Sequence, residues 1–162
     1  MSIINVGNLE VEDVREEFPD NEGYTNRDLS DITEIIIHHT DTPEGLEDMD
    51  AIGRVYRYHT ESLGWPGIGY HFMIGGKGRF YCTGGAETVR YHTRGFNDTT
   101  IGVCVIGNFS QIYPSCRTVS DLDTLVRNIM MGLGKELPVV GHKERFSTEC
   151  PGSLLDAYRE FV

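Results

Sequence analysis

The stretch Ile35–Thr40, Ile-Ile-Ile-His-His-Thr, joins an uninterrupted apolar run to a pair of histidines. Three consecutive isoleucines favour a strand that is buried on both faces, because a strand with one exposed face shows polar residues at alternate positions. Such a strand belongs inside a sheet that has helices on both sides. Consecutive side chains of a strand point to opposite faces, so His38 and Thr40 share one face and His39 points to the other.

Strand-like and helix-like segments alternate along the rest of the chain. We expect strands at 32–38, 69–74, 79–83, 101–106 and 137–140, with 69–74 and 79–83 forming a hairpin around Gly75–Gly78. We expect helices at 46–62, at 120–133 with Ser120 as the N-cap, and at 154–161 with Ser153 as the N-cap. This order predicts one α/β domain at residues 31–162, with a mixed central β-sheet flanked by helices.

Residues 1–30 are polar and weakly periodic, and we expect them to form an N-terminal appendage packed on that domain. Val11, Val14 and Phe18 fit one face of a short helix that ends before Pro19. The start has no Lys or Arg before Arg15 and no apolar stretch of secretory length, so no signal peptide is expected. Either the protein is made in a cytoplasm or its leader was removed.

Size and charge exclude several classes of partner. The chain has 162 residues, 39% hydrophobic content and a net charge of −11, values that suit one globular domain with a single core. The negative charge argues against a nucleic-acid partner, since phosphate binding needs a basic surface. No apolar run approaches the roughly 20 residues of a membrane span. We also expect a monomer.

The four cysteines, Cys82, Cys104, Cys116 and Cys150, are loosely spaced. Because the chain is not a small disulfide-rich scaffold, we expect reduced thiols. Cys104 stands in an apolar strand segment, where it fits a small buried residue. A Cys82–Cys104 bridge between strands remains the alternative.

A second motif places a histidine and a cysteine on one short loop: Gly141-His142, seven further residues, then Cys150-Pro151-Gly152. Together with His38, these residues offer two imidazoles and one thiolate to a single ion. Three protein ligands with a fourth position open are typical of catalytic zinc. The alternatives are a buried cysteine beside an unrelated histidine, a cysteine nucleophile with a histidine base, and structural zinc, for which a C-x-x-C pair is missing.

Hydrolysis at such a site needs a donor for the oxygen that becomes negative when water attacks a carbonyl. Tyr70, within Gly69–Phe72, suits that task because its hydroxyl donates a hydrogen bond without carrying charge. The simpler alternative is a half-buried aromatic residue of a strand.

Five motifs occur in one order along residues 32–160. They are 35–40, Gly64-Trp65 with 68–72, 92–97, 101–103 with 106–109, and Gly141-His142 with Cys150-Pro151-Gly152. In this order they resemble the zinc-dependent N-acetylmuramoyl-L-alanine amidases, the type shared by phage endolysins and peptidoglycan recognition proteins. The resemblance implies that family's α/β fold and hydrolysis of the amide between N-acetylmuramic acid and L-alanine in peptidoglycan.

The resemblance also implies roles for individual residues. His38, His142 and Cys150 match the ligands of Zn²⁺, and Tyr70 matches the catalytic tyrosine. Thr148 stands where phage enzymes have lysine and many recognition proteins have threonine, so it is expected to be a neutral and weaker donor to the tetrahedral intermediate.

His92 and Asn97 fall in the stretch that lines the family's substrate groove, which predicts contact with the muramyl peptide. The chain departs from the pattern at Gly67, where the family often has Asp, and at Cys82–Gly85, where an arginine often follows the hairpin. We expect these departures to alter the groove and not the metal site. The remaining histidines, His39, His59 and His71, are expected to be structural.

The resulting hypothesis is a phage or prophage endolysin, made in the host cytoplasm and acting on the cell wall after release at lysis. The alternative is a non-catalytic peptidoglycan-binding module of the same fold. Such members of the family typically lack the cysteine ligand, whereas this chain has Cys150 and both histidines. A third hypothesis is an unrelated zinc amidohydrolase or peptidase on the same scaffold.

Overall fold

The computed structural model describes residues 2–162 and contains one mixed seven-stranded sheet in the order β1-β2-β5-β4-β6-β3-β7. The strands are β1 (Ser2–Val6), β2 (Leu9–Asp13), β3 (Glu34–His39), β4 (Phe72–Ile74), β5 (Phe80–Cys82), β6 (Thr100–Val105) and β7 (Val139–Gly141). The helices are α1 (Asp48–Arg57), continued by a π-helical turn at Tyr58–Ser62, α2 (Cys116–Leu133) and α3 (Leu154–Phe161). None of them is long and apolar enough to cross a membrane. The expected α/β domain with a mixed sheet is confirmed.

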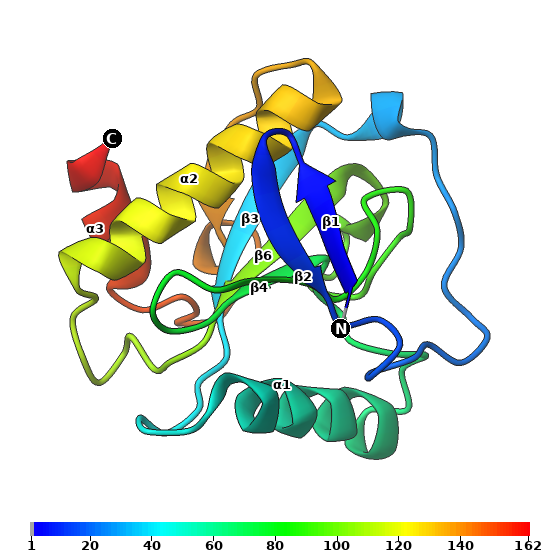
Figure 1. Ribbon diagram of the computed structural model, residues 1–162, viewed down its shortest axis with the longest axis horizontal. Helices are drawn as coiled ribbons and strands as arrows, with labels where there is room; N and C mark the ends of the chain where they lie inside the picture. Colours follow the sequence, from blue (N-terminus) through cyan, green and yellow to red (C-terminus); the bar gives the residue numbers. More distant parts are fainter. Residues whose placement is uncertain (1) are drawn as a thin grey trace.

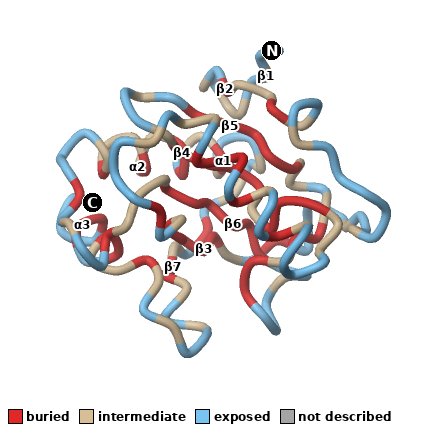
Figure 2. The backbone as a smooth tube through the Cα atoms, turned by 90° about the horizontal axis from the view of Figure 1, so that it is seen from below, coloured by how far each residue is buried: buried red, intermediate tan, exposed pale blue. Residues whose placement is uncertain are grey.

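Strand β3 lies inside the sheet, between β6 and β7, and is parallel to both. Its isoleucines Ile35, Ile36 and Ile37 are fully buried. Ile35 and Ile37 belong to the core that α2 and α3 cover, while α1 covers the opposite face over Met73 and Cys104. Figure 1 shows α1 on one side of the sheet and α2 with α3 on the other, and Figure 2 shows burial concentrated along the strands between them.

The prediction of a short helix that contains Val11 is wrong. Residues 2–13 of the expected appendage form the antiparallel hairpin β1–β2, and β2 pairs in parallel with β5 through Glu12 and Asp13. Val11 packs into the α2 core and Val14 into the α1 core. Val11 and Val14, three residues apart, therefore point to opposite faces of an extended chain. Pairing with β5 favours this extended conformation over a helix.

The expected second helix is correct in place but begins earlier than predicted. Ser115 is its N-cap, and Ser115 Oγ accepts the N–H of Thr118 at 3.1 Å. Ser120 lies inside α2, so its predicted capping role is wrong. Ser153 precedes α3 as expected, but its hydroxyl donates to Phe109 O at 2.8 Å and does not cap the helix.

All four cysteines lie within the described residues and are unpaired. Cys82 is on β5 and Cys104 on β6, with β4 between these strands. The two thiols also belong to the cores on opposite faces of the sheet. The alternative Cys82–Cys104 bridge is therefore excluded.

Candidate metal centre

Three predicted ligands come together at one edge of the sheet. Ligand atoms of His38, His142 and Cys150 all lie within 4.8 Å of one another, and no other such group is found among residues 2–162. The topology explains this, because Ile37 of β3 pairs with Gly141 of β7 and a histidine follows each of them. Cys150 then returns on the loop, with its Sγ 3.9 Å from His38 Nδ1.

Backbone contacts hold the loop that carries the other two ligands. Lys143 N donates to Cys150 O at 2.8 Å, which closes the segment between His142 and Cys150. Gly141 N donates to the carboxylate of Glu144 at 3.0 Å, and Arg159 of α3 pairs with the same carboxylate. These contacts fix the backbone of the loop next to both ligands.

The protonation of this donor set fits a divalent metal. Burial lowers the pKa of His38 well below its usual value and lowers that of His142, so both imidazoles keep a free lone pair. Burial raises the pKa of the Cys150 thiol to about 12, so thiolate formation requires a cation. The backbone N–H of His39 donates to Cys150 Sγ at 3.3 Å, a bond that favours the thiolate. Two nitrogens and one sulfur are a set that zinc prefers.

Tyr70 lies directly beside this cluster, two residues before β4. The centroids of its ring and that of His38 are 5.0 Å apart. Burial, reinforced by the neighbouring thiols of Cys104 and Cys150, raises the pKa of Tyr70 well above its ordinary value. The phenol therefore stays protonated at neutral pH and can act as a hydrogen-bond donor.

Thr148 is half-buried on the loop that carries Cys150. Its Oγ1 accepts the backbone N–H of Cys150 at 3.3 Å. Because that contact uses a lone pair of the hydroxyl oxygen, the hydroxyl hydrogen stays free to donate. The side chain thus combines a fixed position next to a ligand with an uncommitted donor.

The structure places His92 and Asn97 behind the ligands. His92 is 7% exposed, and its Nδ1 lies 2.9 Å from His38 Nε2. Asn97 Oδ1 accepts the backbone N–H groups of His92 and Thr93, at 3.0 and 2.8 Å, and so fixes the turn between them. Contact of either residue with a muramyl peptide stays a prediction.

The three histidines expected to be structural each accept a backbone N–H at Nδ1. His39 accepts from Phe109 at 3.0 Å, His59 from Gly69 at 2.9 Å and His71 from Gly102 at 3.0 Å. None of them belongs to the ligand group. Each ring thus accepts a backbone N–H from another part of the chain.

Sequence reasoning missed the ion pair of Arg90 and Asp20. The Arg90 side chain is 1% exposed and makes two bonds of 2.7 Å to the Asp20 carboxylate. A Cβ on Gly67 would collide with that carboxylate, and a Cβ on Gly84 would collide with the guanidinium. The pair therefore occupies the space that the missing side chains of Gly67 and Gly84 leave open.

This ion pair supports the segment that carries the tyrosine. Arg90 Nε donates to Ile68 O at 3.0 Å, two residues before Tyr70. The ring of Tyr24 lies against the guanidinium, 4.3 Å from its carbon to the ring centroid. An arginine inside the otherwise apolar segment Val89–Tyr91 was the available signal, but its acidic partner is 70 residues away.

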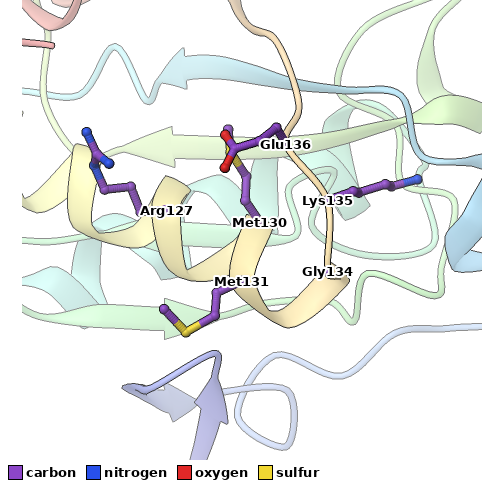
Figure 3. A pocket seen from close by; sticks show the side chains of 6 residues that line it. All are labelled: Arg127, Met130, Met131, Gly134, Lys135 and Glu136. Atoms are coloured by element: carbon purple, nitrogen blue, oxygen red, sulfur yellow. The ribbon is translucent and has the colours of Figure 1, made fainter.

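Two hollows differ in their relation to the ligands. One of about 560 Å³ lies at the end of α2 and is lined by Arg127, Met130, Met131, Gly134, Lys135 and Glu136 (Figure 3). This hollow is on the α2 side of the sheet. Cys104, which pairs with His38 in the sheet, belongs to the core on the α1 side. A second hollow of about 220 Å³ lies between Thr40 and α1 and reaches Tyr70. Only the second adjoins the candidate site.

Comparison with known sequences identifies relatives over most of the chain. Residues 28–153 match the profile of the family described as N-acetylmuramoyl-L-alanine amidase (Amidase_2). Peptidoglycan-recognition protein 1 of Holotrichia diomphalia is 35% identical over 144 residues, which cover 85% of this chain and 70% of that protein. Peptidoglycan-recognition protein SC1a of Drosophila melanogaster is 33% identical over 73% of this chain and 66% of that protein. The human N-acetylmuramoyl-L-alanine amidase is 31% identical over 75% of this chain and 22% of that protein.

Solved structures show the same fold. The ectodomain complex of peptidoglycan recognition proteins LCa and LCx, bound to tracheal cytotoxin, matches with a TM-score of 0.82 and 29% identity, over 93% of this chain and 95% of that one. The N-acetylmuramoyl-L-alanine amidase LysC from Clostridium intestinale matches with a TM-score of 0.73 and 25% identity, over 93% and 94%. The chain therefore belongs to the N-acetylmuramoyl-L-alanine amidase family.

Proposed function

We propose that this protein is a zinc-dependent amidase that cleaves the bond between N-acetylmuramic acid and L-alanine in peptidoglycan. The observation that carries the proposal is the convergence of two imidazoles and one thiol within 4.8 Å. Family membership supports the substrate class, since relatives are named as amidases or peptidoglycan recognition proteins. One of the similar structures holds tracheal cytotoxin.

His38, His142 and Cys150 would hold the ion through two nitrogens and one sulfur. When bound in such a three-ligand site, zinc supplies Lewis acidity and lowers the pKa of water to about 7. The protein's part is to fix the geometry and to keep both imidazoles neutral. Burial of His38 and the loop contacts of His142 and Cys150 do this.

Tyr70 and Thr148 would stabilise the carbonyl oxygen of the scissile amide as it becomes negative. Both can donate a hydrogen bond from a neutral hydroxyl, so neither has to lose or gain a proton first. Tyr70 lies beside His38, and Thr148 is anchored to the backbone of Cys150. Donors fixed in this way need no reorganisation when the charge develops.

The hollow that reaches Tyr70 is the best place for the stem peptide. It is open along Thr40 and α1, and its lining joins hydroxyls to the apolar side chain of Val55. Arg54 adds a positive charge at its rim. A peptide that carries carboxylates can therefore lie along this side with its first amide next to the ligands.

Peptidoglycan binding without hydrolysis is the second candidate, because several relatives are named as recognition proteins. The two candidate functions differ in whether they require Cys150, since binding alone does not need the cysteine ligand. Cys150 is present, and a backbone N–H is directed at its sulfur. An endolysin role, with action on the wall after lysis, also belongs to the proposal.

The deciding experiment incubates purified cell walls with the zinc-loaded protein and analyses the products. We expect new L-alanine amino groups without new reducing sugar, and loss of this activity with a chelator or in Cys150→Ser. Sedimentation with walls serves as the control, because the variant should still bind. Wall binding without any amine release by the zinc-loaded protein would support the recognition module and contradict hydrolysis.

A further inference from the structure

The two ring nitrogens of His38 face different neighbours. Nδ1 faces Cys150 Sγ at 3.9 Å, and Nε2 faces His92 Nδ1 at 2.9 Å. A neutral imidazole has a hydrogen on one nitrogen and a lone pair on the other. His38 can therefore use Nδ1 toward a metal only if its hydrogen is on Nε2.

A chain of hydrogen bonds determines where that hydrogen lies. Phe96 O can only accept, and Thr100 Oγ1 donates its one hydrogen to it at 2.7 Å. Toward His92 Nε2, 3.2 Å away, Thr100 Oγ1 can then only accept, so the hydrogen of His92 is on Nε2. His92 Nδ1 is left as a lone pair, and it must accept from His38 Nε2.

The surroundings support this polarity. Both rings are buried, and none of their hydrogen-bond partners is a carboxylate that would favour a charged imidazolium. Thr93 Oγ1 lies 3.0 Å from His92 Nδ1 and 3.4 Å from His38 Nε2. Its oxygen can accept from His38 Nε2, so that His92 Nδ1 and Thr93 Oγ1 share the one hydrogen on that nitrogen, which agrees with the assigned position of that hydrogen.

The His92 ring has little freedom to move from this position. Its backbone N–H is bound by Asn97 Oδ1 at 3.0 Å. The ring lies against the bare backbone of β6 at Gly102, where a Cβ would come within 2.6 Å of His92 Cγ. The register of β3 with β6 places Gly102 opposite Ile36, which is two residues before His38 and on the same face of β3.

We propose that His92 is a positioning residue that accepts the Nε2 hydrogen of His38 and so holds Nδ1 bare and directed at the metal site. This inference rests on the metal site of the proposed function. It gives His92 a task behind the ligand. Removing the partner that fixes a ligating histidine typically lowers metal affinity 10- to 100-fold.

The test measures zinc affinity by competition with a chromophoric chelator, together with the ¹⁵N signals of the imidazoles in metal-free protein. His92→Phe removes the acceptor, and we expect a dissociation constant for zinc raised by roughly 10- to 100-fold. His92→Asn offers a carbonyl oxygen near the place of Nδ1 and should recover most of the loss. Thr100→Val removes only the hydroxyl and should weaken zinc binding less than His92→Phe.

In the metal-free wild type, we expect hydrogen on Nε2 of His38 and a bare Nδ1, and a mixture of the two forms in His92→Phe. His71→Asn is the matched control, because His71 is buried 5.7 Å from His92, between ring centroids, without touching a ligand. Its zinc affinity should stay within twofold of the wild type. Circular dichroism and unfolding midpoints establish that each variant is folded.

A folded His92→Phe protein that binds zinc within twofold of the wild type would overturn the proposal. So would hydrogen on Nδ1 of His38 in the metal-free wild type. If His92→Phe does not fold, His92→Asn and Thr100→Val decide by the same two measurements. If the wild type binds zinc but releases no amine from walls, the proposed function fails while this inference is still tested.

Discussion

His38 Nδ1 lies 3.9 Å from Cys150 Sγ, although 112 residues separate the two side chains in the sequence. The parallel pairing of β3 with β7 brings their ends to one edge of the sheet, and the loop after β7 then turns back toward His38. The candidate metal centre therefore lies at the carboxyl ends of β3 and β7, and residues near it can be tested one at a time.

Tyr70→Phe tests the donor beside the ligands. Loss of one hydrogen bond to a developing oxyanion typically costs 10²- to 10³-fold in kcat, and we expect a decrease of about that size. Zinc affinity should not change, because the hydroxyl is not a ligand. Kinetics on a soluble muramyl peptide, with zinc content measured in parallel, checks both statements.

Tyr81→Phe is the control for that prediction. Tyr81 donates to Asp48 at 2.7 Å on the same face of the sheet but is not next to the ligands. Its removal should cost about 1 kcal/mol of unfolding free energy and leave kcat unchanged. Equal kcat values for Tyr70→Phe and Tyr81→Phe would show that the Tyr70 hydroxyl takes no part in catalysis.

The ion pair of Asp20 and Arg90 gives a prediction about stability. Asp20→Ala leaves a buried guanidinium without its partner, and such losses cost about 3–5 kcal/mol. Because a third of the Asp20 side chain is exposed, we expect the lower end, about 3 kcal/mol. Urea unfolding at neutral pH measures the difference.

A second substitution tests whether Asp20 replaces an acid at position 67. Gly67→Asp alone should destabilise the protein, since its side chain would meet the Asp20 carboxylate. Combined with Asp20→Ala, it should recover part of the lost stability by facing Arg90. If the two effects simply add, position 67 cannot supply the missing charge, and the explanation of Gly67 is wrong.

Stability should fall as the pH is lowered below about 6.5, with His59 as a measurable contributor. Burial lowers the pKa of His59 to about 4 from an ordinary value of 6.5. The unfolded chain therefore takes up a proton first, so the contribution is complete above pH 6.5 and is lost between pH 6.5 and 4. This shift corresponds to about 3 kcal/mol.

His59→Asn isolates that contribution, because its amide oxygen can still accept the N–H of Gly69. Urea unfolding with a chelator present, at several values between pH 7 and pH 4, compares the two proteins. The variant should lose less stability than the wild type over this interval, by about 3 kcal/mol. Parallel curves would mean that His59 is not neutral in the folded protein.

The central strand and the pairing of His142 with Cys150 on one loop could be predicted from local signals, and the order of the five motifs added His38, which the structure places beside them. The three consecutive isoleucines Ile35–Ile37 predict a strand that is buried on both faces, and all three are buried. The spacing of His142 and Cys150 fits one short loop. What remained hidden depends on partners far away in the chain. The extended conformation of β2 depends on its pairing with β5, and the position of the Asp20 side chain depends on its ion pair with Arg90.

The direction of His92 could not be predicted for a related reason. Its motif suggests a groove residue, which stays a prediction, and nothing in the motif shows that its ring lies against Gly102 with Nδ1 facing His38. Ser115 and Ser120 are both plausible caps in sequence, and in the structure Ser115 Oγ accepts the N–H of Thr118 while Ser120 lies inside α2. For the His92 ring, as for β2 and Asp20, the deciding contact joins residues from different segments.

X-ray absorption at the zinc edge, on the zinc-loaded protein, tests the central claim most directly. The account predicts one zinc per chain with a single sulfur at about 2.3 Å and two imidazole nitrogens at about 2.0–2.1 Å. In Cys150→Ser the sulfur contribution should disappear. A zinc shell made only of oxygen and nitrogen in the wild type would contradict the claim that Cys150 and the two histidines hold one ion.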